Sequence, residues 1–185
     1  MYKRQLFIHG PGGKTGGFEG GWLLAKLQEP TKNIRYTADV RIDEGTELDD
    51  ENGVTVMSVG ALDPNSDTTH IVIAALRLGK TKNVLYLTDI GSDAGQGGMQ
   101  PTTLTRPFPI DAWIHVELTL ETRNDGTIAV SVLLDGAHAG GGTLSAGSLT
   151  VGDMNFSLGG SRRGDVDTPA GPFSGRFDNV TIDLD

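Results

Sequence analysis

A row of polar side chains that could bind or transform a substrate lies within residues 113–121. These side chains alternate with apolar ones, so the two-residue period of a β-strand places them on one face. Two carboxylates on one face can act as acid and base in the cleavage of a glycosidic bond. The alternative is a strand face that is hydrated or lines a ligand. The row consists of His115, Glu117, Thr119 and Glu121.

The strand that carries this row belongs to a β-hairpin formed by residues 111–136. The alternating apolar residues of both its strands are expected to face the hydrophobic core. Asn124, Asp125 and Gly126 lie between the strands and tolerate positive φ, so the chain can reverse there. The core residues predicted on this hairpin are Ile114, Val116, Leu118, Ile128, Val130 and Val132.

Similar patterns predict further strands along the chain, and none of the stretches has a helical period. Residues 33–42 alternate, whereas residues 70–78 are almost continuously apolar, which predicts a central strand covered on both faces. Residues 89–109 are predicted to form an irregular loop, and residues 137–152 only short strands. The sequence therefore predicts an all-β domain, a sandwich or barrel of about ten strands. The other predicted strands are residues 22–27, 53–62, 83–88, 155–160 and 173–184.

The composition limits the classes of partner that the chain can bind. Its 185 residues carry a formal net charge of −9. This charge argues against nucleic acid and against a membrane surface, because phosphate groups need clustered Lys and Arg. The chain contains no cysteine, which excludes disulfides and thiolate metal ligands. No apolar run approaches the roughly 20 residues of a membrane span.

The first five residues, MYKRQ, resemble the translation of a sequencing adapter. We therefore expect residues 1–5 to be an artefact of assembly from metagenomic reads. Residues 6–185 are then one domain, with other domains of the same polypeptide possible upstream. A genuine basic start of the protein is the alternative. Because a signal peptide could have been lost upstream, its absence here is compatible with an extracellular or cell-surface location.

Two motifs resemble the concanavalin A-like lectin/glucanase superfamily, in particular its laminin-G-like bacterial domains. Trp113 and the Leu134-Asp135-Gly136 end of the hairpin are similar to the family pattern W-x-x-V…V-D-G. Residues 175–182 resemble the closing strand G-x-I-D-N-V. The resemblance implies an antiparallel jelly-roll sandwich of two curved sheets. Trp113 lies next to the polar row; the alternative to a role at the ligand face is burial in packing, as is usual for its counterpart in the family.

The resemblance further implies a carbohydrate ligand. Endoglucanases of the superfamily carry E-x-D-x-E on one strand, but Thr119 replaces the middle Asp here and this strand lies at a different place in the chain. We therefore expect a non-catalytic, lectin-like module of a larger secreted or surface protein. One alternative is a structural or adhesive module without sugar binding, and another is a glycan hydrolase or lyase. The residues expected to contact the sugar are His115, Glu117, Gln96, Arg106, Arg162 and Arg163.

Calcium is the cofactor that the sequence predicts. Asp43, Glu47, Asp49 and Asp50 lie in one acidic segment, and carboxylate oxygens in a flexible loop suit Ca²⁺. The resemblance also implies a structural calcium ion, since the family often carries one. The alternative is a hydrated acidic turn. The four histidines lie far apart in the sequence and show no paired spacing of metal ligands.

Overall fold

The computed structural model describes residues 21–27, 31–44, 46, 48, 54–62, 70–88, 100–145, 149, 152–159 and 174–185. Within these residues the chain forms eleven strands and no helix. In this part of the chain there is thus no helix that could cross a membrane. The strands are β1 (Gly21–Leu27), β2 (Asn33–Ile42), β3 (Val54–Leu62), β4 (His70–Leu78), β5 (Asn83–Leu87), β6 (Gln100–Thr103), β7 (Trp113–Thr122), β8 (Ile128–Leu134), β9 (Ala137–Leu144), β10 (Gly152–Leu158) and β11 (Gly175–Leu184).

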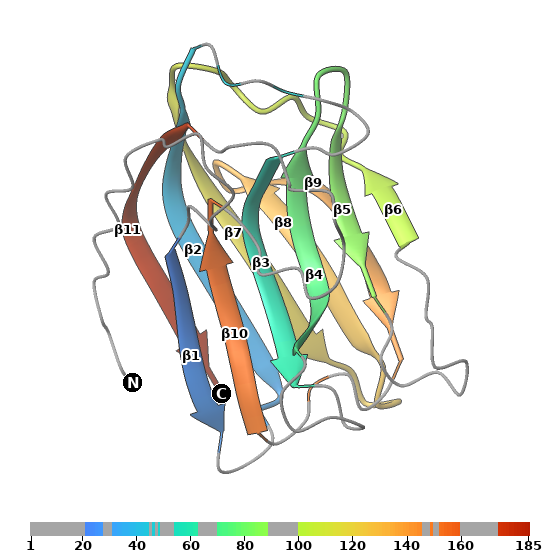
Figure 1. The fold of residues 1–185 in the computed structure, drawn as a ribbon. Coiled ribbons are helices and arrows are strands. Elements are labelled where there is room, and N and C mark those ends of the chain that lie inside the picture. Colours follow the sequence, from blue (N-terminus) through green and yellow to red (C-terminus); the bar gives the residue numbers. More distant parts are fainter. Residues whose placement is uncertain are drawn as a thin grey trace.

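The strands form two antiparallel sheets that pack face to face, as Figure 1 shows. The six-stranded sheet has the order β1-β10-β3-β4-β5-β6, and the five-stranded sheet has the order β11-β2-β7-β8-β9. Several neighbours in the sheets are distant in the sequence: β11 pairs with β2, β2 pairs with β7, and β10 lies between β1 and β3. The prediction of an all-β, antiparallel jelly-roll sandwich is therefore confirmed.

The hydrophobic core lies between the sheets and follows the two-residue period of the strands. All six core residues predicted on the 111–136 hairpin are at most 6% exposed. Tyr36 of β2 connects the two sheets, because its ring meets Phe156 of β10 edge to face, with the ring centroids 5.5 Å apart. Its hydroxyl also donates a hydrogen bond to the carbonyl of Ser157, at 3.1 Å. Burial raises the pKa of the Tyr36 phenol, which keeps this donor protonated.

Strand β4 occupies the central position that its apolar sequence predicts, between β3 and β5. Residues 73–78 are all buried, so both faces of the strand are covered. From Ala74 to Leu78, beyond a register shift near Ile73, the residues of β4 with odd and even numbers point to opposite faces. Arg77 is among the buried ones and is only 8% exposed. A charged side chain on a covered outer face is unusual and belongs to the polar cluster described below.

Two sequence predictions about loops are wrong. Residues 137–152 contain the eight-residue strand β9, and residues 89–109 contain the short strand β6. The small and polar residues of this region predicted only short strands, but the glycines of β9 are needed for close packing. A Cβ atom at Gly141 would lie 2.4 Å from the carbonyl oxygen of Val130 in the neighbouring strand β8. Here glycine fits a strand because the backbones approach too closely for a side chain.

We expect Val116→Ala to destabilise the protein by about 2 kcal/mol or more, by analogy with other large-to-small core changes. Val116 is fully buried in the centre of β7, so the truncation would leave a cavity between the sheets. Equilibrium unfolding in urea measures the change. Arg123→Ala, an exposed residue in the β7–β8 turn, is the control. A loss for Val116→Ala below half of the expected value would mean that the core tolerates this cavity.

Candidate functional site

The polar row of β7 lies on the outer face of the five-stranded sheet, next to a second polar row on β2. Because β2 pairs with β7, Arg41 stands opposite Trp113, Asp39 opposite His115, and Thr37 opposite Glu117. Directly opposite residues of antiparallel strands share one face, with their Cβ atoms about 5 Å apart. The prediction that the apolar residues of β7 face inward and its polar residues outward is therefore confirmed.

Glu117 forms an ion pair with Arg35 on this face. Arg35 of β2 donates a hydrogen bond to its carboxylate at 2.6 Å. Arg35 is mostly exposed, so the pair contributes little to stability. It does, however, hold the carboxylate of Glu117 in place. Glu117 is thus a weaker candidate for direct ligand contact than the sequence predicts.

His115 belongs to a hydrogen-bonded cluster that joins three strands. Its Nδ1 atom lies 2.6 Å from one carboxylate oxygen of Asp39, and the side-chain amide of Asn179 in β11 donates to the other oxygen at 2.6 Å. The backbone N–H of His115 donates to the side chain of Asp135 at 2.9 Å. We call Asp39, His115 and Asn179 the Asp39 cluster. It presents a carboxylate, an imidazole and a carboxamide in fixed positions.

The hydrogen bonds of the Asp39 cluster determine the charge state of its carboxylate. Partial burial alone would raise the pKa of Asp39, but the hydrogen bonds from Asn179 and His115, together with the charge of His115, outweigh it and lower that pKa below 3.8. Asp39 is therefore ionised at neutral pH. An ionised carboxylate accepts hydrogen bonds from a ligand and donates none.

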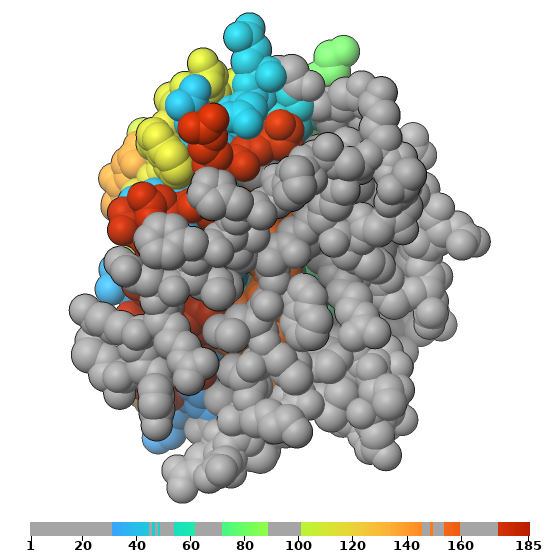
Figure 2. All heavy atoms as spheres, turned by 60° about the vertical axis from the view of Figure 1, so that its left-hand side comes forward, coloured from blue at the N-terminus to red at the C-terminus, as the bar shows by residue number. Residues whose placement is uncertain are grey.

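Trp113 lies at the start of β7, on the same face as the Asp39 cluster. Its side chain is 48% exposed, so the alternative that Trp113 is buried in packing is wrong. Arg41, opposite Trp113, is held by Asp111, and Arg176 of β11 stands opposite Arg41. Figure 2 shows the red residues of β11 close to the cyan end of β2 and to yellow residues near the start of β7. An exposed indole and two guanidinium groups thus lie in one row.

Three residues with positive φ surround this part of the sheet. Asp111, Asp135 and Asn179 have φ values of 57°, 50° and 49°. Asn179 lies in a β-bulge, where the register between β11 and β2 shifts, and the bulge directs its side chain toward Asp39. Asp and Asn occupy this backbone region more readily than other non-glycine residues. The D-N-V part of the closing-strand motif thus serves the Asp39 cluster, a role that the sequence motif alone does not reveal.

The other predicted ligand residues are only partly described. Arg106 is exposed and donates a hydrogen bond to the carbonyl of Leu134 at 2.9 Å. It therefore lies near Asp135, at the edge of the same sheet. Gln96, Arg162 and Arg163 lie outside the described residues.

The predicted calcium ligands are likewise mostly outside the described residues, which include Asp43 but not Glu47, Asp49 or Asp50. The carboxylate of Asp43 lies 4.0 Å from Arg41. Among the described residues there is no group of three acidic or histidine side chains that could hold a metal ion. Calcium binding by the acidic segment stays a prediction.

A second polar cluster, missed in the sequence, lies on the outer face of the six-stranded sheet. The guanidinium of Arg77 in β4 lies 4.9 Å from the ring centroid of Tyr86 in β5, a cation–π arrangement. Thr55 of β3 stands opposite Arg77. The hydroxyl of Thr55 is buried without a hydrogen-bond partner. Ser58 and Ser157 bond to each other on the same face. Arg77 lies within the apolar sequence of β4, and a single cation in such a sequence does not by itself indicate a functional site.

The fold occurs in several solved structures. An endo-β-1,4-glucuronan lyase from the fungus Trichoderma reesei aligns with a TM-score of 0.61 and 14% identity, over 96% of this chain and 78% of that chain. A pentraxin from Limulus polyphemus aligns with a TM-score of 0.58 and 14% identity, over 94% and 73% of the two chains. Sheep galectin-11 aligns with a TM-score of 0.51 and 9% identity, over 88% and 96%.

This chain has the jelly-roll sandwich fold of those structures. No family model matches the sequence, and none of the curated proteins matches it. At such low identity the likeness concerns the fold alone, because one fold serves many functions. The function must therefore be argued from the two polar faces.

We expect Asn179→Gly to raise the pKa of Asp39 toward 3.8, because the variant lacks the amide donor while glycine keeps the positive φ. A carboxyl titration by NMR measures the change. Asp125, whose pKa is lowered by Thr127 in the distant hairpin turn, serves as an internal control and should not respond.

The lowered pKa also makes stability depend on pH. The folded-state pKa of Asp39 is below its unfolded value, so its contribution is complete above about pH 4 and is lost as the pH falls through the folded pKa. Asn179→Gly should therefore lose less stability on acidification than the parent protein. An equal loss in both proteins would show that the Asn179 hydrogen bond does not stabilise the ionised carboxylate.

Proposed function

We propose that this domain is a non-catalytic carbohydrate-binding module, with its binding site around Trp113 on the outer face of the five-stranded sheet. The observation that carries the proposal is the exposure of Trp113, at 48%, on the face that holds the Asp39 cluster. An exposed indole offers a flat apolar surface for the C–H face of a sugar ring. Small-ligand sites combine such a surface with a few fixed polar groups.

The spacing of the groups suits one or two sugar rings. Trp113 and His115 are two residues apart along β7, which corresponds to about 7 Å in a strand. Beside them, the carboxylate of Asp39 accepts hydrogen bonds from sugar hydroxyls, and the guanidinium of Arg41 donates to them. The existing hydrogen bonds of Asp39 and Arg41 hold these groups in place before binding, which lowers the entropy cost of association.

The comparisons support this proposal at the level of the fold. The chain shares its sandwich with a pentraxin, a galectin and the LG1-3 region of the laminin α2 chain. We propose that the chain is a laminin-G-like module of a larger extracellular or cell-surface protein. Calcium bound by the acidic segment around Asp43 would stabilise a loop beside Arg41.

A glycan array, probed with and without Ca²⁺, tests the proposal and identifies a ligand. With that ligand, we expect Trp113→Ala to weaken binding by about tenfold or more, because a stacked aromatic contributes on the order of 1 kcal/mol beyond its buried area. Trp113→Phe should retain part of the affinity. Arg123→Ala, at the opposite end of the same hairpin, should bind normally.

His115→Ala and Glu117→Gln locate the site along β7. We expect a larger effect from His115→Ala, since Glu117 is occupied by Arg35. A glycan that binds all four folded variants as tightly as the parent protein would place the site elsewhere. If no glycan binds in either calcium condition, the domain is better explained as a structural or adhesive module.

A polysaccharide lyase is the second candidate function, and the Arg77–Tyr86 pair favours it. The β-elimination of a uronate requires a positive group that neutralises the carboxylate and a group that transfers a proton. Arg77 and Tyr86 are residue types suited to these two tasks, and they lie in contact. The structural similarity to a glucuronan lyase makes β-1,4-glucuronan the substrate to test.

The lyase candidate is tested by the ultraviolet absorbance of the unsaturated chain ends that elimination produces. We expect no increase in absorbance with β-1,4-glucuronan, as the non-catalytic proposal requires. An increase that Tyr86→Phe abolishes, in a variant with an unchanged melting temperature, would instead establish the lyase. Trp113→Ala serves as the control, since it alters only the opposite sheet.

A further inference from the structure

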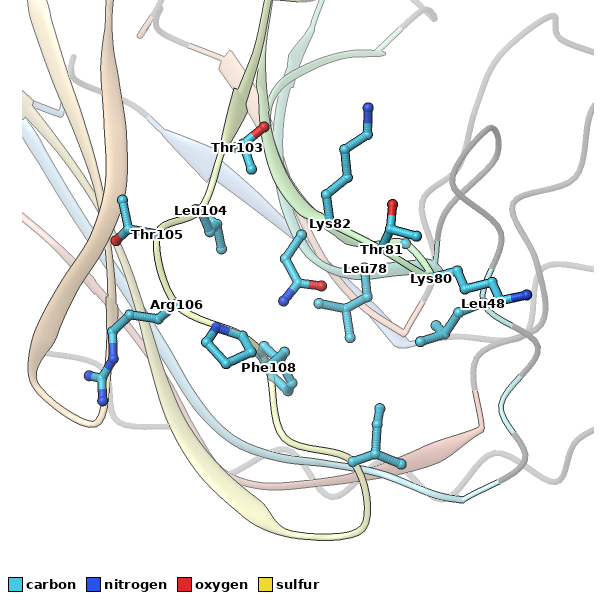
Figure 3. A pocket seen from close by; sticks show the side chains of 14 residues that line it. Leu48, Leu78, Lys80, Thr81, Lys82, Thr103, Leu104, Thr105, Arg106 and Phe108 are labelled. Carbon is cyan, nitrogen blue, oxygen red and sulfur yellow. The ribbon is translucent and has the colours of Figure 1, made fainter.

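A cavity of about 280 Å³ lies at one end of the sandwich. It is bounded by the β4–β5 turn and by the segment that connects β6 to β7, as Figure 3 shows. Its apolar lining residues are Leu48, Leu78, Leu104, Pro107, Phe108 and Ile110. The proposed carbohydrate site uses none of these residues.

The floor of the cavity is built from ends of core elements. Leu78 is the last residue of β4, and Leu104 directly follows β6. Leu78, Leu104 and Phe108 are at most 7% exposed, whereas Ile110 at the edge is 44% exposed. Among the described residues, the exposed large apolar side chains are Ile110 and Trp113. Ile110 therefore offers apolar surface to a molecule that enters the cavity.

The charged side chains that line the cavity, within the described residues, are all cations. They are Lys80, Lys82 and Arg106, in a chain whose net charge is −9. Arg106 is bound to the carbonyl of Leu134, and Figure 3 shows it directed away from the hollow. Lys80 and Lys82 are exposed; Figure 3 shows both side chains extending outward from the rim, and their flexible stems can turn an ammonium group toward the mouth. Their ammonium groups are therefore the available partners for a negative charge at the mouth.

We propose that this cavity binds a small organic carboxylate with an apolar body, independently of the carbohydrate site. The apolar body lies against Leu104, Phe108 and Ile110, and the carboxylate stays at the mouth, near Lys80 and Lys82. The volume is close to the lower limit of ordinary ligand pockets, which restricts the ligand to a short alkyl or single-ring acid. Flexible lysine side chains can follow such a group without disturbing the strands.

Hexanoate is a suitable probe, with hexanamide and hexylamine as matched compounds of equal length. We expect hexanoate to bind, and to shift the backbone NMR signals of residues 79–83 and 104–110. Hexanamide should bind more weakly, and hexylamine should not bind, because its charge has the same sign as the rim. Equal binding of hexanoate and hexylamine, or shifts confined to other parts of the chain, would overturn the proposal.

Variants test the contributions of the charged rim and of the apolar lining to binding separately. We expect the double variant Lys80→Gln, Lys82→Gln to weaken hexanoate binding about fivefold, the effect of losing roughly 1 kcal/mol of exposed charge attraction. Hexanamide binding should not change. Lys32→Gln, an exposed lysine outside the cavity, is the charge control. An equal loss of hexanoate binding in the control would mean that net charge alone is responsible.

Ile110→Ser tests the apolar contact, and we expect it to weaken hexanoate and hexanamide alike. Because Ile110 is partly exposed, the variant should remain folded, which its melting curve verifies. Trp113→Ala should leave hexanoate binding unchanged, and the double lysine variant should leave glycan binding unchanged. Loss of hexanoate binding in Trp113→Ala would show that the cavity is not an independent site.

Discussion

Strand β2 is the element on which both the core and the outer polar face depend. Its side chains with even numbers, from Ile34 to Ile42, are completely buried, and those between them form the polar row with β7. A shift of one residue in its pairing would exchange the two faces. Tyr36 opposes such a shift, because its hydroxyl reaches the carbonyl of Ser157 in the other sheet. The same register therefore fixes the packing and the Asp39 cluster.

The local patterns of the chain predicted what depends on local periodicity. The alternation in residues 113–122 correctly separated the buried face of β7 from its polar face. It could not identify the partners of that polar face, because they come from distant strands. Arg35 and Glu117 are 82 residues apart, and Asn179 and Asp39 are 140 residues apart. Such contacts follow from the order of strands in the sheet, which no local pattern contains.

Trp113 and the glycines of β9 show two different limits of sequence interpretation. Alternation from His115 places Trp113 on the outer face, and its exposure agrees with this local rule and not with the alternative of burial in packing. In the β9 region the small and polar residues predicted only short strands, yet close contact with the backbone of β8 requires glycine in a longer strand. A glycine can thus be required by the lack of space around it or by its backbone conformation, and only the structure distinguishes these two reasons.

The position of β11 has a consequence for the order in which the protein can fold. This strand, Gly175–Leu184, pairs along β2, whose residues are made more than 130 positions earlier in the chain. While the chain is being synthesised, β2 therefore keeps one edge of backbone donors and acceptors without its final partner. Exposed strand edges invite pairing with other chains. β2 carries three outward charges, Arg35, Asp39 and Arg41. These charges would disfavour pairing of the open β2 edge with another chain before β11 is made.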